Sequence, residues 1–323
     1  MIRIGLIGCG FMGTMHANCY NAIEGVEVVA VADLRRDKAE ALAKLSNAKI
    51  YEKGMDLIAS EEVDAIDICL PTYLHASHAE AAMRKAKYVF VEKPVTLTVQ
   101  EGKKLLAVQK ETGAGVQVGQ VIRFWDEYVW LKELIDNGKY GKPVNAMFRR
   151  LSPRPSGWNN WFLNPDLSGG ALQDLHIHDI DYMLYCFGQP KSFRTVKAHG
   201  GERNSYVATV ADYGDLAVCV EGSWDFPADF PFEMFFRVKF ERAVAELSNA
   251  GLKLYTDAGA ENVVLQKKFV AEVKGAGNIS DLGGYYNELA YFTDCIKKGE
   301  KPQMAGLGDA VESVKFIHEE MKA

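Results

Sequence analysis

Short apolar runs alternate with amphipathic segments over the first 120 residues of the chain. Five runs are apolar on nearly both faces, which is typical of strands inside a buried parallel sheet. They are Ile2–Ile7, Val26–Ala32, Ala65–Leu70, Tyr88–Val91 and Gly115–Val118. Segments of helical periodicity separate them, over Met12–Ile23, Lys38–Leu45, His75–Lys85 and Val99–Thr112. This alternation predicts right-handed crossovers and a doubly wound α/β sheet.

The pattern becomes strand-rich after a further predicted helix over Glu127–Asn137. Five segments then alternate or carry β-branched and aromatic residues, namely Val144–Leu151, Tyr206–Tyr213, Leu216–Trp224, Met234–Phe240 and Ala243–Leu247. Further helices are expected over Ala171–Phe187, Tyr286–Lys298 and Leu307–Met321. We therefore predict an N-terminal Rossmann-type domain over residues 1–122, followed over residues 123–303 by an α+β domain with a mostly antiparallel sheet.

Composition and charge exclude several classes of protein. The 323 residues are enough for two domains, and the 48% hydrophobic and 25% charged content is that of a globular chain. The apolar runs are too short for a membrane helix, and residues 1–10 lack a cleavable apolar core. A net charge of −6 argues against a nucleic-acid partner. Six cysteines without CxxC spacing favour free thiols in the cytoplasm.

A glycine pattern, Gly8-x-Gly10-x-x-Gly13, follows the first predicted strand and opens a helix. In this context the first glycine permits a tight turn, the second lets backbone amides approach a pyrophosphate, and the third allows close helix packing. Unpaired amides at the helix start attract phosphate. The pattern predicts dinucleotide binding, and a purely structural strand–turn–helix is the alternative.

An acidic residue, Asp33, ends the second predicted strand, about twenty residues after the glycines. Its carboxylate is suited to accept a hydrogen bond from the ribose 2′-hydroxyl and would repel a 2′-phosphate. This favours NAD over NADP. Arg35 and Arg36 leave NADP open, because a guanidinium there would attract a phosphate.

Glu92-Lys93-Pro94 stands at the carboxyl end of the fourth predicted long strand. Ligands of open α/β sheets bind beyond these ends, so Lys93 is expected beside the nicotinamide. The proline restricts the preceding residue and permits a cis bond, either of which would fix the direction of the lysine. The alternative is a surface lysine before a turn.

The segment Ala171–Phe187 carries the most polar helical face. At about 100° per residue, Asp174, His178, Asp181 and Tyr185 fall within about 40° of one direction and form a predicted exposed face. Asp174 and His178 are four residues apart and can touch, so the carboxylate would orient the imidazole as a general base. His176 falls at the edge of the apolar stripe, and we expect it to be packed with its ring hydrogen-bonded.

The same segment has two alternative interpretations. His176-x-His178-Asp179 has the composition of a metal site, but histidines two apart share a face only on a strand, and we expect no metal. Asp174 and His178 could also form a solvated surface pair with no chemical role.

These motifs together resemble the Gfo/Idh/MocA oxidoreductases. The resemblance rests on GCGFMG, Asp33, PTYLH at Pro71–His75, EKP at Glu92–Pro94 and GGALQDLHIHDID, and its Asp-x-x-x-His spacing is nearest the inositol 2-dehydrogenase branch. It covers essentially the whole chain. It implies an open-faced C-terminal sheet that forms a homodimer or homotetramer, and a final helix, about residues 304–323, near the first domain.

The resemblance also assigns roles to individual residues. It implies the catalytic set Lys93, Asp174 and His178. Cofactor contacts are implied from Phe11, Met12, Leu70, Pro71, Thr72, His75, Glu92, Gln120 and Trp161, in addition to Gly8, Gly10, Asp33 and Arg35. Substrate contacts are implied from Arg123 and from Tyr285 or Tyr286. His176 stands where relatives often carry a small residue, which leaves open which histidine is the base.

The expected activity is oxidation of a secondary hydroxyl group of a cyclic polyol or sugar by NAD. Neutral His178 would take the hydroxyl proton and Lys93 would stabilise the developing alkoxide. Three alternatives remain: an NADP-dependent carbonyl or dihydrodiol reductase, an NAD-dependent glycosidase, and a catalytically idle NAD-binding sensor. The particular polyol or sugar and the direction of the reaction in the cell are left open.

Overall fold

The protein is described by a computed structural model over residues 1–60, 62–198, 205–266 and 283–322. Ala323, the last residue of the expected terminal segment, lies outside these ranges. The chain divides into two units, each with a sheet of its own. The first comprises Met1–Phe124 and the described part of Lys268–Val314, and the second comprises the described parts of Trp125–Lys267 and Lys315–Ala323.

The first unit is built on a six-stranded sheet in the order β3-β2-β1-β4-β5-β6, in which every pair is parallel. The strands are β1 (Ile2–Ile7), β2 (Val26–Ala32), β3 (Lys49–Tyr51), β4 (Ala65–Ile68), β5 (Tyr88–Val91) and β6 (Gly115–Val118). The doubly wound parallel sheet is confirmed. The three-residue β3 was not predicted, because it lies at the sheet edge and lacks an apolar run.

Helices of the first unit begin and end close to the predicted residues, except for the helix over Gly54–Ser60, which was not predicted. They are α1 (Phe11–Ala22), α2 (Arg36–Ser46), α3 (Gly54–Ser60), α4 (His75–Lys85), α5 (Val99–Thr112) and α9 (Gly283–Lys298), with 3₁₀ turns η1 (Thr72–Leu74) and η2 (Val121–Phe124). The capping box of α5 forms, since the Glu101 amide donates to Thr98 Oγ1 at 3.2 Å and the Thr98 amide donates to Glu101 Oε2 at 2.9 Å.

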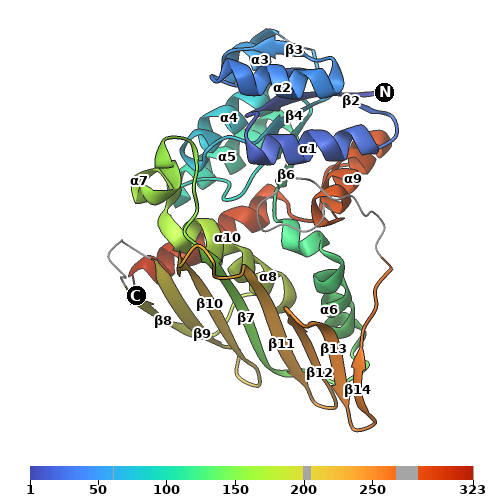
Figure 1. Cartoon of the computed structure of the whole chain (residues 1–323), viewed down its shortest axis with the longest axis vertical. Helices are drawn as coiled ribbons and strands as arrows, with labels where there is room; N and C mark the ends of the chain where they lie inside the picture. Colours follow the sequence, from blue (N-terminus) through green and yellow to red (C-terminus); the bar gives the residue numbers. More distant parts are fainter. Residues whose placement is uncertain (61, 199–204, 267–282, 323) are drawn as a thin grey trace. The chain divides into compact units, whose positions relative to one another are not determined.

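Helix α9 belongs to the first unit, although its residues fall within the 123–303 range assigned to the second domain from the sequence. It lies beside α1 (Figure 1) and also contacts η2 and β1. Its buried face includes Leu289 and Phe292, and the Phe292 ring packs edge-on against Phe90 of β5. Contacts far apart in the sequence therefore decide its place, and local periodicity does not encode them.

The second unit contains an eight-stranded sheet in the order β14-β13-β12-β11-β7-β10-β9-β8. All neighbours are antiparallel except β10 and β7, which confirms a mostly antiparallel sheet. The strands are β7 (Pro143–Pro153), β8 (Ser192–Ala198), β9 (Tyr206–Asp212), β10 (Ala217–Phe226), β11 (Glu233–Phe240), β12 (Val244–Ser248), β13 (Gly251–Thr256) and β14 (Gly259–Asn262). Strands β8, β13 and β14 were not predicted, because their exposed positions are polar or mixed.

Two helices pack on this sheet, α6 (Asp126–Asn137) and α8 (Ile177–Phe187), as Figure 1 shows. Tyr128 of α6 stacks edge-on against Tyr182 of α8 at 4.8 Å and Phe236 of β11 at 5.2 Å between ring centroids. A buried ion pair of 2.9 Å joins Arg150 of β7 to Asp179 of α8. Aromatic burial and this ion pair fix α8 against the sheet.

The remaining elements are short or contribute residues to both units. They are η3 (Trp158–Leu163), α7 (Pro165–Ser168), the π-helix η4 (Leu172–His176) and α10 (Leu307–Lys322), of which residues 315–322 belong to the second unit. Within the described ranges, none of the helices has the length and apolar character needed to cross a bilayer. All six cysteines carry free thiols, as the spacing predicted.

Candidate active site

The glycine loop between β1 and α1 has the geometry that the sequence predicts. Gly8 adopts φ of +97°, and a Cβ there would lie 2.4 Å from the Cys69 carbonyl oxygen. A Cβ on Gly13 would lie 1.8 Å from the Gly8 carbonyl oxygen, so glycine is required where α1 crosses the loop. Gly10 caps α1 without a side-chain hydrogen bond. The first-turn amides of α1 are thus suited to a phosphate.

Asp33 directly follows β2 and lies beside this loop, where its carboxylate accepts hydrogen bonds from Arg35. Arg35 Nε donates to Asp33 Oδ1 at 3.0 Å and Nη2 donates to Oδ2 at 2.9 Å, while the Cys9 amide also donates to Oδ2. Burial alone would raise the pKa of Asp33, but these hydrogen bonds and the guanidinium charge lower it. The carboxylate therefore stays ionised. Arg35 Nη2 also lies 3.4 Å from where a Cβ on Gly10 would be.

The loop after β4 carries Leu70, Pro71 and Thr72 and leads into α4 at His75. His75 is buried, with Nδ1 2.7 Å from the Pro94 carbonyl oxygen and Nε2 2.6 Å from that of Leu70. Burial lowers the pKa of His75, and the two carbonyls oppose that shift. Both ring nitrogens thus contact backbone and tie the loop after β4 to the one after β5.

Glu92-Lys93-Pro94 follows β5 at the carboxyl edge of the sheet, and the Lys93–Pro94 bond is cis. The Lys93 amide donates to Glu92 Oε2 at 3.0 Å. Glu92 is buried and Lys93 half-buried. A Cβ on Gly119 would lie 3.0 Å from the Glu92 carboxyl group, so a larger residue directly after β6 would require this carboxyl group to shift.

The side-chain amide of Gln120 bears on whether the first unit can hold a dinucleotide. Its side chain is fully buried, yet neither the amide nitrogen nor the amide oxygen has a hydrogen-bond partner among the described residues. It closely follows β6 at the same carboxyl edge as Glu92. Buried amides rarely stay unsatisfied. Together with the glycine cradle, this side chain fits a bound dinucleotide.

The predicted substrate residues Arg123 and Tyr285 are both buried. Arg123 Nη1 donates to Asp309 Oδ2 at 2.7 Å. Tyr285 starts the buried face of α9, with its ring centroid 6.4 Å from that of His16, whereas Tyr286 is half-buried. Arg123 is thus engaged within the first unit through an ion pair that sequence spacing did not reveal.

In the second unit, the polar helix begins differently from the prediction. Leu172–His176 is a π-helix, and regular α-helix starts only at Ile177. The single α-helix expected over Ala171–Phe187 is therefore wrong in its first turn. A π-helix has more residues per turn than an α-helix, so angles at 100° per residue do not hold before His176. π-Segments of this kind recur at functional sites.

The face predicted as exposed is mostly buried. Asp174 is 8% exposed and Asp181 is fully buried, whereas His178 is half-buried. The prediction that Asp174 and His178 share an exposed face is therefore wrong in its exposure, because Asp174 is buried and His178 is half-buried. The aromatic packing of α8 and the sheet explain the burial, because they enclose the helix on more than its apolar stripe. A low-dielectric setting strengthens the influence of a carboxylate on an imidazole.

His176 is packed and hydrogen-bonded, as predicted. It is fully buried, and its Nε2 lies 3.3 Å from Glu320 Oε1 of α10. A Cβ on Gly222 of β10 would lie 2.9 Å from His176 Nδ1, so glycine makes room for the ring. Trp161, predicted as a cofactor contact, lies in η3 and stacks on Phe162 at 4.0 Å.

Two matches identify the family. Residues 2–120 match the model of an oxidoreductase family with an NAD-binding Rossmann fold, and residues 128–244 match the Gfo/Idh/MocA C-terminal domain. The chain belongs to the Gfo/Idh/MocA family. Its first unit is accordingly an NAD-binding Rossmann domain.

Individual relatives of this Gfo/Idh/MocA chain include dehydrogenases of cyclic polyols. It is 32% identical over 217 residues to inositol 2-dehydrogenase of Salmonella typhimurium strain LT2, covering 65% of this chain and 61% of that protein. It is 33% identical over 218 residues to scyllo-inositol 2-dehydrogenase (NAD(+)) of Bacillus subtilis strain 168, covering 67% and 61%. The match thus spans about three fifths of each relative. The fold resembles levoglucosan dehydrogenase in complex with NADH and levoglucosan, at TM-score 0.86 and 19% identity, covering 99% and 96%.

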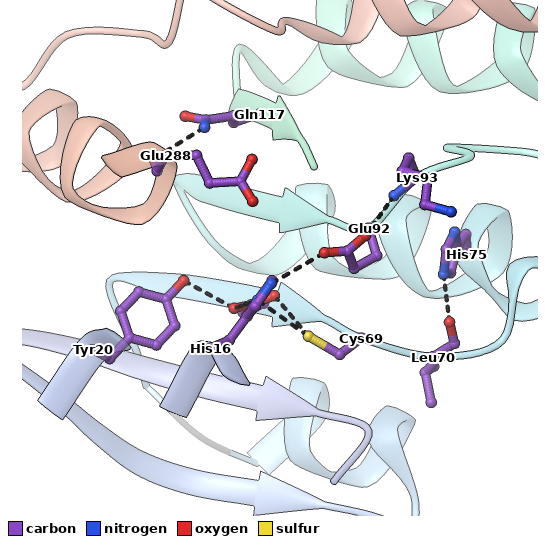
Figure 2. A network of polar contacts seen from close by, with 10 residues as sticks. His16, Tyr20, Cys69, Leu70, His75, Glu92, Lys93, Gln117 and Glu288 are labelled. Atoms are coloured by element: carbon purple, nitrogen blue, oxygen red, sulfur yellow. Dashed lines mark hydrogen bonds and ion pairs between the residues drawn. The ribbon is translucent and has the colours of Figure 1, made fainter. Parts of the chain in front are cut away.

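A buried polar cluster near Lys93 of this Gfo/Idh/MocA chain was not predicted from the sequence. It consists of His16, Tyr20, Asp67, Cys69, Glu92 and Glu288 (Figure 2), and we call it the buried network. One signal was present, because Asp67 is a carboxylate in the middle of an otherwise apolar strand. Glu288 of α9 could not be assigned to this cluster from the sequence, because it is far from the other members along the chain.

The two groups of described side chains close enough to share a metal ion both contain His16 of this network. Neither contains His176 or His178. The His-x-His alternative therefore gains no support from the geometry of the described residues.

Proposed function

We propose that this protein is an NAD-dependent dehydrogenase that oxidises a secondary hydroxyl group of an inositol-like cyclic polyol or sugar. The observation that carries the proposal is the placement of Lys93 at the carboxyl end of β5, on the same sheet edge as the glycine cradle and the unsatisfied Gln120. Ligands of such sheets bind at this edge. The inositol dehydrogenases among its relatives supply the substrate class.

The cofactor contacts are assigned to residues of both units. The cradle of Gly8, Gly10, Phe11 and Met12 would hold the pyrophosphate, and Asp33 the ribose. The remaining proposed contacts are Arg35, Leu70, Pro71, Thr72, His75, Glu92, Gln120 and Trp161. When bound, NAD supplies the hydride acceptor of the reaction. Each Asp33 carboxylate oxygen already accepts two hydrogen bonds. Binding of the ribose hydroxyl would therefore displace an Arg35 nitrogen from one of these oxygens.

In this proposal, side chains of the protein accept the hydroxyl proton of the substrate and stabilise the negative charge that develops on its oxygen. Neutral His178 accepts the hydroxyl proton as the carbon-bound hydrogen departs with its electron pair, so that a carbonyl forms. Asp174 orients the imidazole and stabilises the resulting imidazolium. The Lys93 ammonium donates to the reacting oxygen and stabilises its developing negative charge. Arg123 and Tyr285 are assigned to the substrate. The cytoplasmic location and a homodimer or homotetramer remain predictions.

A substrate screen tests this proposal. Myo-inositol, scyllo-inositol and a set of aldoses and glucosides are offered with NAD or NADP, and reduced nicotinamide is followed by absorbance. We expect turnover with at least one inositol-like polyol and NAD. Tight NAD binding without turnover of any substrate would contradict the proposal and favour a sensor.

Two variants test the catalytic assignments. Lys93→Ala and His178→Ala should each lose about 10²–10⁴-fold in kcat, the usual effect of removing a positioned acid–base group. Both should bind NAD with nearly the wild-type Kd. Lys103→Ala, an exposed change on α5, is the control. Near-normal turnover in either variant would remove that residue from the mechanism.

A further inference from the structure

A chain of buried polar contacts connects Tyr20 to the backbone of Lys93 (Figure 2). The Tyr20 hydroxyl donates to Asp67 Oδ2 at 2.9 Å, and the same oxygen lies 2.8 Å from His16 Nδ1. His16 Nε2 lies 3.1 Å from Glu92 Oε1, an ion-pair contact. Glu92 Oε2 in turn accepts from the Lys93 amide. The contacts run from α1 through β4 to the end of β5.

Glu288 enters this network from α9. It is 0% exposed, and neither of its carboxyl oxygens has a hydrogen-bond partner among the described residues. One of its carboxyl oxygens lies within 4.8 Å of a His16 ring nitrogen and of a Glu92 oxygen. Two buried carboxylates at this distance do not both ionise at low cost. Burial, and secondly the charge of Glu92, raise the pKa of Glu288 well above its ordinary value.

His16 supplies the balancing positive charge. Burial alone would lower the pKa of His16, but the Asp67 carboxylate, together with Cys69, raises it well above 6.5. The ring therefore stands as an imidazolium between Asp67 and Glu92. The imidazolium thus places a positive charge 3.1 Å from Glu92 Oε1, while the Lys93 amide donates a hydrogen bond to Oε2.

We propose that His16 and Glu288 are positioning residues that act through Glu92 to hold Lys93 in its productive orientation. The imidazolium keeps Glu92 ionised, and Glu288 in its neutral acid form adds no repelling charge. Glu92 then fixes the backbone from which the lysine projects. The proposal rests on the catalytic role of Lys93 given under the proposed function.

Deprotonation of Glu288 has a defined consequence. A second negative charge would face Glu92 and push its carboxylate from the Lys93 amide, and a misplacement of about 1 Å at a reacting group costs up to about 100-fold in rate. The titratable groups near the Glu288 carboxyl group are His16 and Cys19 of α1, Asp67 of β4 and Glu92 after β5, and the uncharged Gln117 of β6 donates to the Glu288 backbone carbonyl. As pH rises, Glu288 gains a negative charge and His16 loses its positive charge, and both changes leave more negative charge around Glu92, so the effect belongs to alkaline pH.

The test compares pH profiles of kcat and KM for the wild type and Glu288→Gln with NAD and the best polyol. Glutamine has the size of the protonated acid and cannot ionise. The alkaline limb on which the wild type loses kcat should move to higher pH in the variant, with KM and the Kd of NAD little changed. Glu111→Gln, the same change at an exposed site on α5, should keep the wild-type profile.

Two further variants and a spectrum complete the test. His16→Asn should lower kcat by about 10–100-fold with little change in the Kd of NAD, and Glu92→Gln should lower kcat by a similar factor. Infrared spectroscopy should show a protonated buried carboxyl band that is lost in Glu288→Gln. This spectrum can be measured without turnover, and it does not depend on whether His16→Asn folds.

The outcomes separate this inference from the proposed function. If Lys93→Ala is inactive but Glu288→Gln loses kcat at the same alkaline pH as the wild type, the positioning role is wrong and the proposed dehydrogenase function is unaffected. If Lys93→Ala turns over normally, the proposed function fails instead. Absence of the carboxyl band would overturn the inference. So would a stoichiometric divalent metal in the purified wild type that is missing from Glu288→Gln, because His16, Glu92 and Glu288 would then be its ligands.

Discussion

At the scale of single residues, a few side chains owe their chemistry to neighbours distant in the sequence. Asp33 is ionised because two Arg35 nitrogens and two backbone amides donate to it, despite its partial burial. The pKa of Glu288 is raised because its carboxyl group is buried and lies close to Glu92. The pKa values of two carboxyl groups are thus shifted in opposite directions by the groups around them.

The Asp33 carboxylate should set the choice between NAD and NADP. Asp33→Asn keeps the size of the side chain but removes the charged acceptor, and a hydrogen bond to a charged group is worth about 1.5–3 kcal/mol. We expect the Kd of NAD to rise about 10–100-fold and that of NADP to fall, since Arg35 is released. Asp37→Asn, exposed in the first turn of α2, is the matched control. Unchanged preference after Asp33→Asn, measured by titration of both cofactors, would contradict the assignment.

Stability should depend on pH through Glu288. Its folded pKa is raised, so the folded state holds this proton more tightly than the unfolded state does above pH about 4.5. The corresponding stabilisation is present at low pH and is lost as pH rises toward the folded pKa, at up to about 1.4 kcal/mol per pH unit. Urea unfolding of the wild type and Glu288→Gln between pH 5 and about 9 measures this difference. A difference that does not vary with pH would show that Glu288 is ionised in the folded state.

At the scale of elements, features set by a few neighbouring residues could be predicted, and features set by tertiary packing could not. The α5 capping box follows from four residues of sequence, and α5 ends at Gly113 with φ of +71°. The π-turn before α8 follows from no local rule, because the surrounding sheet and helices enclose it. The segment before α8 was therefore predicted as α-helix, whereas Leu172–His176 is a π-helix.

Removing the α5 cap should cost a predictable amount. Thr98→Ala deletes the hydroxyl that accepts from the Glu101 amide, and such losses cost about 0.5–2 kcal/mol. The free energy of unfolding from urea titration should fall by about 1 kcal/mol. Lys103→Ala, exposed in the same helix, should change it by less than about 0.5 kcal/mol. An equal effect of the two changes would mean that the box does not stabilise α5 in solution.

At the scale of the whole molecule, two units with separate cores carry the two halves of the proposed chemistry. The first unit holds the glycine cradle, Asp33 and Lys93, and the second holds Asp174 and His178. Each set is positioned by its own sheet and helices. Binding of a dinucleotide to the first unit should therefore be measurable without catalysis.

Addition of NAD should stabilise the folded protein as a whole. At 100 times its Kd, a ligand that binds only the folded state contributes about 2.7 kcal/mol, which raises Tm. Lys93→Ala should show the same shift as the wild type at equal saturation, because its effect is on chemistry. Differential scanning fluorimetry measures both. Failure of NAD to raise the wild-type Tm at any concentration would contradict cofactor binding to the folded protein.

The amino-acid sequence by itself determined the parallel sheet, the glycine cradle, the strand-end Lys93 and the packed His176, because each depends on short-range periodicity or on residues at fixed spacing. Only the tertiary structure decided the burial of Asp174, the place of α9 and the meeting of His16 with Glu288. These depend on contacts between segments up to 272 residues apart, and hydrophobic burial and desolvation act there without regard to chain order.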